Sequence, residues 1–82
     1  MSTTSNRVLT EQSAAAAGRI PEFGIVRMRH AVRAEGYQIP PNTRGTVVAI
    51  YGDGAAYAVE IADLPGGPEV VTLRADQIER IF

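Results

Sequence analysis

Apolar and polar residues alternate along much of the chain beyond residue 20. In Ile25–His30, for example, Val26 and Met28 fall on one side of the pattern and Arg27 and Arg29 on the other. A period of two is typical of a β-strand with one buried face, whereas an amphipathic helix repeats its apolar positions roughly every three or four residues. The pattern therefore predicts an all-β domain.

Five strands are predicted, separated by residues that favour turns. Their ranges are Ile25–His30, Gly45–Tyr51, Ala55–Ala62, Glu69–Leu73 and Ile78–Phe82. Gly52–Gly54 is predicted as a tight hairpin turn, because glycine permits positive φ, and Asp63–Pro68, with its prolines and glycines, as a surface loop. Arg74–Gln77 is short and polar and predicts a single helical turn. Within the third strand, Tyr57 is assigned to the core.

The connection from Ala31 to Asn42 is predicted to be a long loop. Gly36, Pro40 and Pro41 interrupt it, because proline lacks the amide donor that a strand ladder needs. The connection also carries three residues that are too apolar for a free loop, so we expect it to fold back over the strands. These residues are Val32, Tyr37 and Ile39.

The order of these elements is five short strands, with a long irregular connection after the first and a helical turn before the last. This order predicts a small SH3-like five-stranded barrel over residues 21–82. Closing a sheet on itself protects strand edges that would otherwise pair with other chains. An open meander covered by a helix from the N-terminal segment is the competing architecture.

Residues 1–20 are predicted as an N-terminal tail, because residues 1–18 are rich in serine, threonine and alanine and, beyond Met1, hold no apolar residue larger than Val8 and Leu9 with which to build a core. We expect a flexible tail or a short helix here, with the boundary to the barrel at Gly18–Pro21. Thr10 is a candidate N-cap for a helix that ends at Ala17, because a hydroxyl group satisfies the unpaired N–H groups at a helix start. Such a helix is too short to be stable alone and is expected to form only on docking.

The charge of the chain is unevenly distributed, although the net charge of the 82 residues is only −1. Residues 20–50 hold four arginines against two glutamates, a net +2, whereas residues 51–82 hold two arginines against six acidic residues, a net −4. A basic side and an acidic side favour docking to a charged partner or to a second copy, although both sets are also consistent with ordinary solvated faces.

The length fits one small domain, and the absence of cysteine excludes disulfide bonds and thiolate metal sites.

The residue types that enzymes need are scarce. Nucleophilic catalysis requires a nucleophile beside a base, but all three serines lie in the first 20 residues, and cysteine and lysine are absent. His30 is the single histidine, with no Asp or Glu nearby in sequence to complete a zinc site. No glycine-rich phosphate-binding motif is present. We therefore expect no enzymatic activity, no cofactor and no metal.

The expected location follows from what the sequence lacks. The longest apolar runs are four or five residues, against about 20 for a membrane-spanning helix. The first 20 residues lack the basic start and apolar core of a signal peptide. We expect a cytoplasmic protein without a membrane partner.

Four segments carry a recognisable set of packing residues. They are Val26-x-Met28, Gly45-Thr46-Val47-Val48, Tyr57-x-Val59-Glu60-Ile61 and Val71-Thr72-Leu73 followed by Ile78. This set resembles a family of small bacterial SH3-like domains of unknown function, with the pattern V-x-L, G-x-x-G-T-V-V, Y-x-V-E-F and V-T-L. The resemblance covers Phe23–Phe82 and departs from the family at Asn42, where the first glycine of G-x-x-G-T is usual. It implies an SH3-like barrel and, because some members look as if they are encoded beside toxin-like or nuclease-like partners, an antitoxin or immunity role.

We expect the chain to be a non-enzymatic protein-interaction module whose binding surface comprises the Ala31–Asn42 connection and the adjoining turns. Aromatic and arginine side chains supply much of the binding energy in such interfaces. The candidate partner-binding residues are Arg29, Arg33, Tyr37, Arg44, Tyr51, Asp63 and Glu69. For Tyr37 and Tyr51, packing at the barrel lip is the alternative. The expected partner is another protein, encoded by a neighbouring gene in the antitoxin-like case, and a homodimer is the other option.

Two further functions remain open. An RNA-binding SH3-like module of the KOW type would use Arg27, Arg29, Arg33 and Arg44 as a strip of phosphate contacts. The acidic second half and a pI of about 5.7 argue against nucleic acid, because nucleic-acid-binding domains are usually strongly basic. The third function is that of an accessory subunit of a larger enzyme, since SH3-like barrels also occur in nitrile hydratase β subunits.

Overall fold

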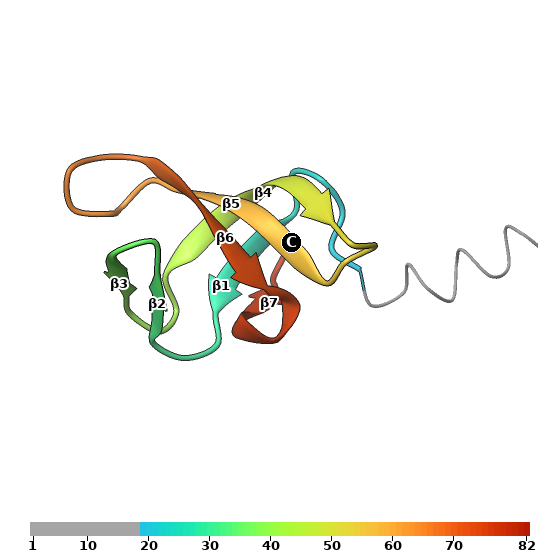
Figure 1. Cartoon of the computed structure of the whole chain (residues 1–82), viewed down its shortest axis with the longest axis horizontal. Helices are drawn as coiled ribbons and strands as arrows, with labels where there is room; N and C mark the ends of the chain where they lie inside the picture. Colours follow the sequence, from blue (N-terminus) through green and yellow to red (C-terminus); the bar gives the residue numbers. More distant parts are fainter. Residues whose placement is uncertain (1–18) are drawn as a thin grey trace, which may run out of the picture.

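Seven short strands build two antiparallel sheets in the computed structural model, which describes residues 19–82 (Figure 1). The strands are β1 (Ile25–Met28), β2 (Val32–Ala34), β3 (Tyr37–Ile39), β4 (Arg44–Tyr51), β5 (Ala56–Ile61), β6 (Glu69–Arg74) and β7 (Ile78–Arg80), and a 3-10 helix, η1 (Ala75–Gln77), precedes β7. The five-stranded sheet has the order β6-β5-β4-β1-β7, and β2 pairs with β3 in the two-stranded sheet. The prediction of an all-β domain is confirmed.

The five predicted strands correspond to β1, β4, β5, β6 and β7, with every end within two residues of the prediction. The predicted single helical turn is η1. The assignment of faces also agrees with the structure, since Val26, Met28 and Tyr57 are completely buried whereas Arg29 is exposed. A period of two in the sequence was therefore a sufficient guide to these strands.

The prediction of a loop without strands over Ala31–Asn42 is wrong, because this segment contains the hairpin β2–β3. Its turn is Glu35–Gly36, where φ is 51° and 86°. Positive φ at both central residues is typical of a type I′ turn, a two-residue turn whose twist matches that of the two strands of a hairpin. The glycine that was expected to interrupt a strand thus makes the turn. Val32 and Ile39 lie opposite each other in the hairpin and are both buried.

The five-stranded sheet is not closed, because its edge strands β6 and β7 do not pair with each other. A closed five-stranded barrel is therefore not confirmed. The hairpin β2–β3 instead lies against β6. The Tyr37 hydroxyl donates to the Glu69 carboxylate at 3.2 Å, and the Thr72 backbone N–H donates to the Glu35 carboxylate at 2.6 Å. These contacts occupy part of the edge that β6 would otherwise offer to another strand.

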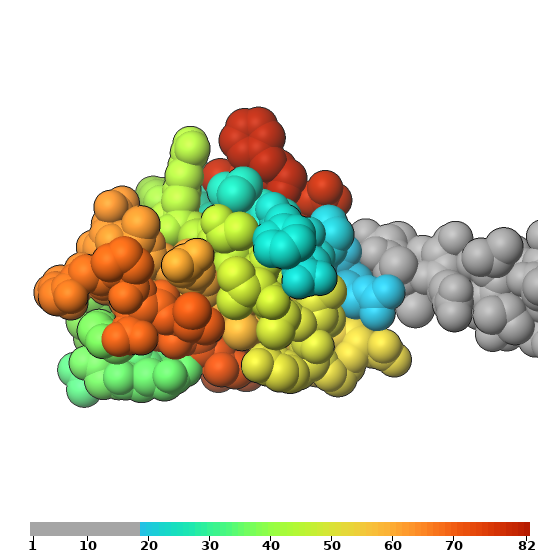
Figure 2. All heavy atoms as spheres, turned by 90° about the horizontal axis from the view of Figure 1, so that it is seen from above, coloured from blue at the N-terminus to red at the C-terminus, as the bar shows by residue number. Residues whose placement is uncertain are grey.

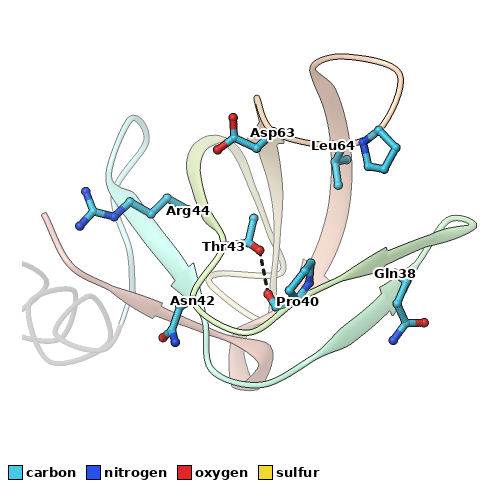
Figure 3. Close-up of a pocket in the computed structure, with 8 residues that line it drawn as sticks. Gln38, Pro40, Asn42, Thr43, Arg44, Asp63 and Leu64 are labelled. Atoms are coloured by element: carbon cyan, nitrogen blue, oxygen red, sulfur yellow. Dashed lines mark hydrogen bonds between the residues drawn. The ribbon is translucent and has the colours of Figure 1, made fainter.

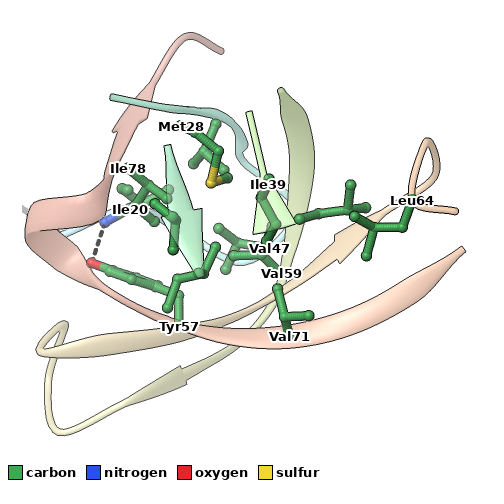
Figure 4. Close-up of a cluster of buried hydrophobic side chains, with 13 residues drawn as sticks. Ile20, Met28, Ile39, Val47, Tyr57, Val59, Leu64, Val71 and Ile78 are labelled. Carbon is green, nitrogen blue, oxygen red and sulfur yellow. Dashed lines mark hydrogen bonds between the residues drawn. The ribbon is translucent and has the colours of Figure 1, made fainter. Parts of the chain in front are cut away.

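Side chains from both sheets meet in one apolar core (Figure 4). The largest fully buried side chains are Tyr57, Met28, Ile39, Ile61, Leu73 and Ile78. Ile20, which the sequence placed in the N-terminal segment, also packs in this core and is only 7% exposed. The helix predicted over Thr10–Ala17 lies outside the described residues. Ile20, the second described residue, thus enters the core directly.

A β-bulge in β4 decides which side chains of this strand face the core. The pairing with β5 shifts register between Val47 and Ala49. Because side chains alternate across a strand, one extra residue exchanges its two faces. Val47 is fully buried before the bulge, Ile50 packs against the core after it, and Tyr51 is left 49% exposed.

Candidate functional site

A groove of about 580 Å³ opens between the β3–β4 turn and the β5–β6 loop (Figure 3). Its lining residues are Gln38, Pro40, Asn42, Thr43, Arg44, Asp63, Leu64 and Pro65. Both segments lie at the same end of the molecule, where the space-filling view shows the orange β5–β6 loop beside the green hairpin (Figure 2). The volume is within the range of about 300–1,000 Å³ that is typical of ligand sites.

The β3–β4 wall of the groove is a turn held by short hydrogen bonds. The Thr43 hydroxyl donates to the Pro40 carbonyl at 2.8 Å, and the Asn42 N–H donates to the Met28 carbonyl at 2.9 Å. Asn42 has a φ of 68°, a conformation that asparagine tolerates better than most residues. Pro41 precedes it, and proline is favoured at that position of a turn. The local sequence therefore accounts for a rigid wall.

The β5–β6 wall is the loop Asp63–Pro68, which is anchored by one buried side chain. Leu64 is 5% exposed and belongs to the core, and its carbonyl accepts the Gly67 N–H at 3.0 Å. Gly66 and Gly67 have φ values of 88° and 110°, which residues with a side chain rarely adopt. The loop projects from the end of the sheet (Figure 1).

A smaller side hollow of about 250 Å³ shares two lining residues with the groove. It is lined by Ile25, Arg44, Gly45, Thr46, Glu60, Ala62 and Asp63. Gly45 is needed here because a Cβ atom at this position would lie 2.9 Å from the Glu60 carbonyl oxygen and would overlap Val59. The glycine thus lets β4 pass close to β5. Arg44 and Asp63 line both the groove and the side hollow.

Arg44 and Asp63 give the groove two opposite charges. Both side chains belong to exposed residues, and neither makes an ion pair or a side-chain hydrogen bond with any other residue of the described range 19–82. Asp63 stands on the β5–β6 wall, whereas the Arg44 guanidinium extends outward at one end of the groove (Figure 3). Two charged groups that remain hydrated in the chain are available to a ligand of complementary charge.

The structure separates the other predicted partner-binding residues from this pair. Tyr37 and Glu69 bond to each other, between the hairpin and β6. Loss of hydration raises the pKa of the Tyr37 hydroxyl above its ordinary value of 10.0, and the Glu69 carboxylate and the charge of Glu35 raise it further. Tyr51 is exposed at the β4–β5 turn, away from the groove lining. Of the predicted set, only Arg44 and Asp63 thus line the groove.

The four arginines of the RNA-binding hypothesis do not form one free strip. Arg27 lies opposite Arg44 in the neighbouring strand, but it forms an ion pair with Glu79 at 3.1 Å. Arg29 donates to the Ile78 carbonyl at 3.0 Å, and Arg33, in the other sheet, donates to Gln38 at 3.3 Å. The other three guanidinium groups thus already hold partners within the protein.

Sequence analysis did not identify two parts of the exposed surface. One is the apolar lining of the groove by Pro40, Leu64 and Pro65, for which the only signal was the presence of proline in two connections. The other is the pair of phenylalanines, Phe23 and Phe82, which are 69% and 71% exposed. The backbone places them on neighbouring segments, since the Ile25 N–H donates to the Phe82 carbonyl at 2.9 Å.

The described residues offer few groups for metal or acid–base chemistry. Within residues 19–82, no three or more His, Asp or Glu side chains are grouped in a way that could hold a metal ion. His30 is exposed, with its Nδ1 3.0 Å from the Ala31 carbonyl oxygen.

No helix in this part of the chain is long and apolar enough to span a membrane. No family model, curated protein or solved structure matches the chain.

Proposed function

We propose that the chain is a non-enzymatic protein-interaction module that binds a protein segment in the groove. The observation that carries this proposal is the position of Arg44 and Asp63, two charges of opposite sign that have no ionic partner among residues 19–82 and line the same groove. Their charges would select the register of a bound segment, because a mismatch leaves like charges together or a charge desolvated. The apolar parts of Pro40, Leu64 and Pro65 would supply contact area.

The walls of the groove support protein binding because they are already ordered. The turn at Pro40–Thr43 and the loop Asp63–Pro68 are each held by proline and by internal hydrogen bonds. A preformed surface loses little conformational entropy on association, so more of the contact energy appears as affinity. This arrangement is better suited to recognition than to catalysis, because the Thr43 hydroxyl in the groove lining donates to the Pro40 carbonyl and not to a base.

The proposal includes an SH3-like architecture. The strand order β6-β5-β4-β1-β7, the hairpin laid against β6 and η1 before the last strand support a small, partly open barrel of this type. The φ of 68° at Asn42 supports the resemblance to the bacterial SH3-like family, because the residue that replaces the usual glycine has the conformation that glycine favours. An open barrel leaves its loops to form the binding surface.

An antitoxin or immunity function is the narrower form of the proposal. Glu60 and Asp63 support it, since both line the side hollow and can face a basic surface of a toxin or nuclease encoded nearby. Asp53 and Glu69 contribute less, because Arg19 and Tyr37 already occupy them. The double variant Glu60→Gln with Asp63→Asn should weaken such a complex most at low salt, where charge contributes most. In such a complex the two carboxylates would take the place of nucleic-acid phosphates in the basic site of the partner, and unchanged affinity of the double variant would exclude this role.

Photo-crosslinking in the native cell tests the protein-binding proposal. The photoreactive residue p-benzoylphenylalanine replaces Gln38 in the groove lining in one variant, and Arg80, which lies outside the groove and the side hollow, in a matched control. The proposal expects a defined protein adduct from position 38 that weakens when Arg44→Glu is added. Equal adducts from both positions, or an adduct that nuclease removes, would refute it, the latter in favour of RNA.

A further inference from the structure

The groove lies directly beside a projection that has the shape to enter a groove. Residues Pro65–Pro68 form the tip of the β5–β6 loop and read Pro-Gly-Gly-Pro, so the tip carries no long side chain. A Cβ atom added at Gly66 or Gly67 would meet no atom within 4 Å, so the tip stands clear of the rest of the described chain. The two prolines restrict the tip before any partner binds. The protein therefore carries a convex and a concave element side by side.

The charges of the two elements are complementary between copies. Asp63 is at the base of the loop and Arg44 is at the end of the groove formed with the opposite turn. A two-fold axis between loop and groove would place the loop of each copy in the groove of the other. In an isologous contact, each residue pair occurs twice, once in each direction across the two-fold axis. Each Asp63 would thus approach the partner copy's Arg44, and no charge of this pair would be left alone.

We infer that the groove binds a second copy of this chain, by reciprocal insertion of the Pro65–Pro68 tips with two Arg44–Asp63 pairs across the interface. This inference rests on the proposed function, because it names the occupant of the same groove. A second copy is favoured over a foreign segment because the convex element, the concave element and both charges are already present on one surface. A domain of this size buries only about 60% of its unfolded surface, and association with a second copy adds to its stability.

Charge reversal with mixing tests this inference on the full chain. We expect the wild-type chain to self-associate in analytical ultracentrifugation, and Arg44→Glu or Asp63→Arg alone to raise the dissociation constant at least about tenfold, because each variant places like charges together twice. An equimolar mixture of the two variants should associate as tightly as wild type, since both contacts in the mixed dimer again join opposite charges. Arg80→Glu, an exposed reversal outside the groove, should leave the dissociation constant unchanged.

The outcomes separate this inference from the proposed function. A wild-type chain that stays monomeric at millimolar concentration overturns the inference, as does a dimer that neither reversal weakens or that the mixture fails to restore. Circular dichroism of each variant shows that a loss of association is not a loss of folding. The mass of the adduct that forms from position 38 then tests the proposed function. An adduct with a foreign protein would support the groove as a binding site and would exclude a second copy as its occupant.

Discussion

The hydroxyl oxygen of Tyr57 accepts a hydrogen bond from the backbone N–H of Ile20 at 2.9 Å inside the apolar core (Figure 4). Tyr57 is completely buried and Ile20 nearly so. The pair ties the first described residues of the chain to the start of β5, although the two residues are far apart in sequence. A buried N–H group that loses its acceptor has no access to water and remains unpaired.

Tyr57→Phe should therefore lower the free energy of unfolding by about 1–3 kcal/mol, the penalty for an unsatisfied buried donor. Urea denaturation followed by circular dichroism measures this change. Tyr51→Phe is the matched control, because Tyr51 is 49% exposed and its loss of a hydroxyl should change stability by less than about 0.5 kcal/mol. Equal effects of the two substitutions would contradict the structural role of the Ile20 contact.

At Gly45, β4 passes close to β5. The Cβ atom of Gly45→Ala would overlap the Val59 side chain and lie 2.9 Å from the Glu60 carbonyl oxygen, so the strands would have to separate. Overpacking of this kind typically destabilises a core by about 1–3 kcal/mol. Thr46→Ala, one position along, adds no atom and should cost less than about 1 kcal/mol. Thermal unfolding of the two variants compares them, and a Gly45→Ala variant as stable as wild type would exclude this close approach.

The strands that the sequence predicted are those in which a period of two extends over several residues. Val26 and Met28 in β1, and Tyr57 and Val59 in β5, are buried as expected because a sheet with one covered face leaves this pattern. The hairpin β2–β3 was missed because each of its strands has only three residues. The bulge near Val48 was missed because an extra residue in a strand leaves no mark in apolar composition.

The candidate site was predictable only in part, for a physical reason. Arg44 and Asp63 were selected from residue type and from their position in connections, and the structure brings them to one groove. Tyr37 and Glu69 were selected in the same way, yet the fold uses them to hold the hairpin to β6. Which polar side chains find partners within the chain depends on tertiary packing, which the sequence pattern does not contain.

The contact between Tyr37 and Glu69 predicts a change of stability with pH. A tyrosine in the unfolded chain ionises near 10.0, whereas the folded chain raises the pKa of Tyr37 above that value. The resulting stabilisation is complete below pH 10.0 and is lost as the pH rises through the folded-state pKa, because the unfolded state then binds fewer protons than the native state. The free energy of unfolding should therefore fall with pH above 10.0.

Tyr37→Phe should make this fall less steep, since the group that holds its proton in the folded chain is gone. Tyr51→Phe should keep the wild-type slope. Urea denaturation at a series of pH values on both sides of 10.0 provides the measurement. The same slope in wild type and Tyr37→Phe would show that the hydroxyl of Tyr37 does not donate to Glu69 in solution.

Phe23 combines an unfavourable backbone conformation with an exposed aromatic ring. It is the third residue of the turn Pro21–Gly24, in which the Gly24 N–H donates to the Pro21 carbonyl at 2.9 Å, and its φ is 69°. Glycine or asparagine is preferred at a turn position of this kind, and other residues lose about 1–2 kcal/mol in the left-handed region. Since the ring is 69% exposed, it recovers little of this by burial.

Phe23→Asn should therefore raise the free energy of unfolding by about 0.5–1 kcal/mol, because asparagine relieves the backbone while little buried area is lost. Phe82→Asn is the control: Phe82 is equally exposed but is not among the non-glycine residues with positive φ, so its substitution should change stability by less than about 0.5 kcal/mol. Chemical denaturation of the two variants gives the comparison. Phe23→Asn could instead lower the stability while Phe82→Asn does not. This result would mean that the Phe23 ring packs against the protein in solution and that this packing outweighs the backbone strain at the turn.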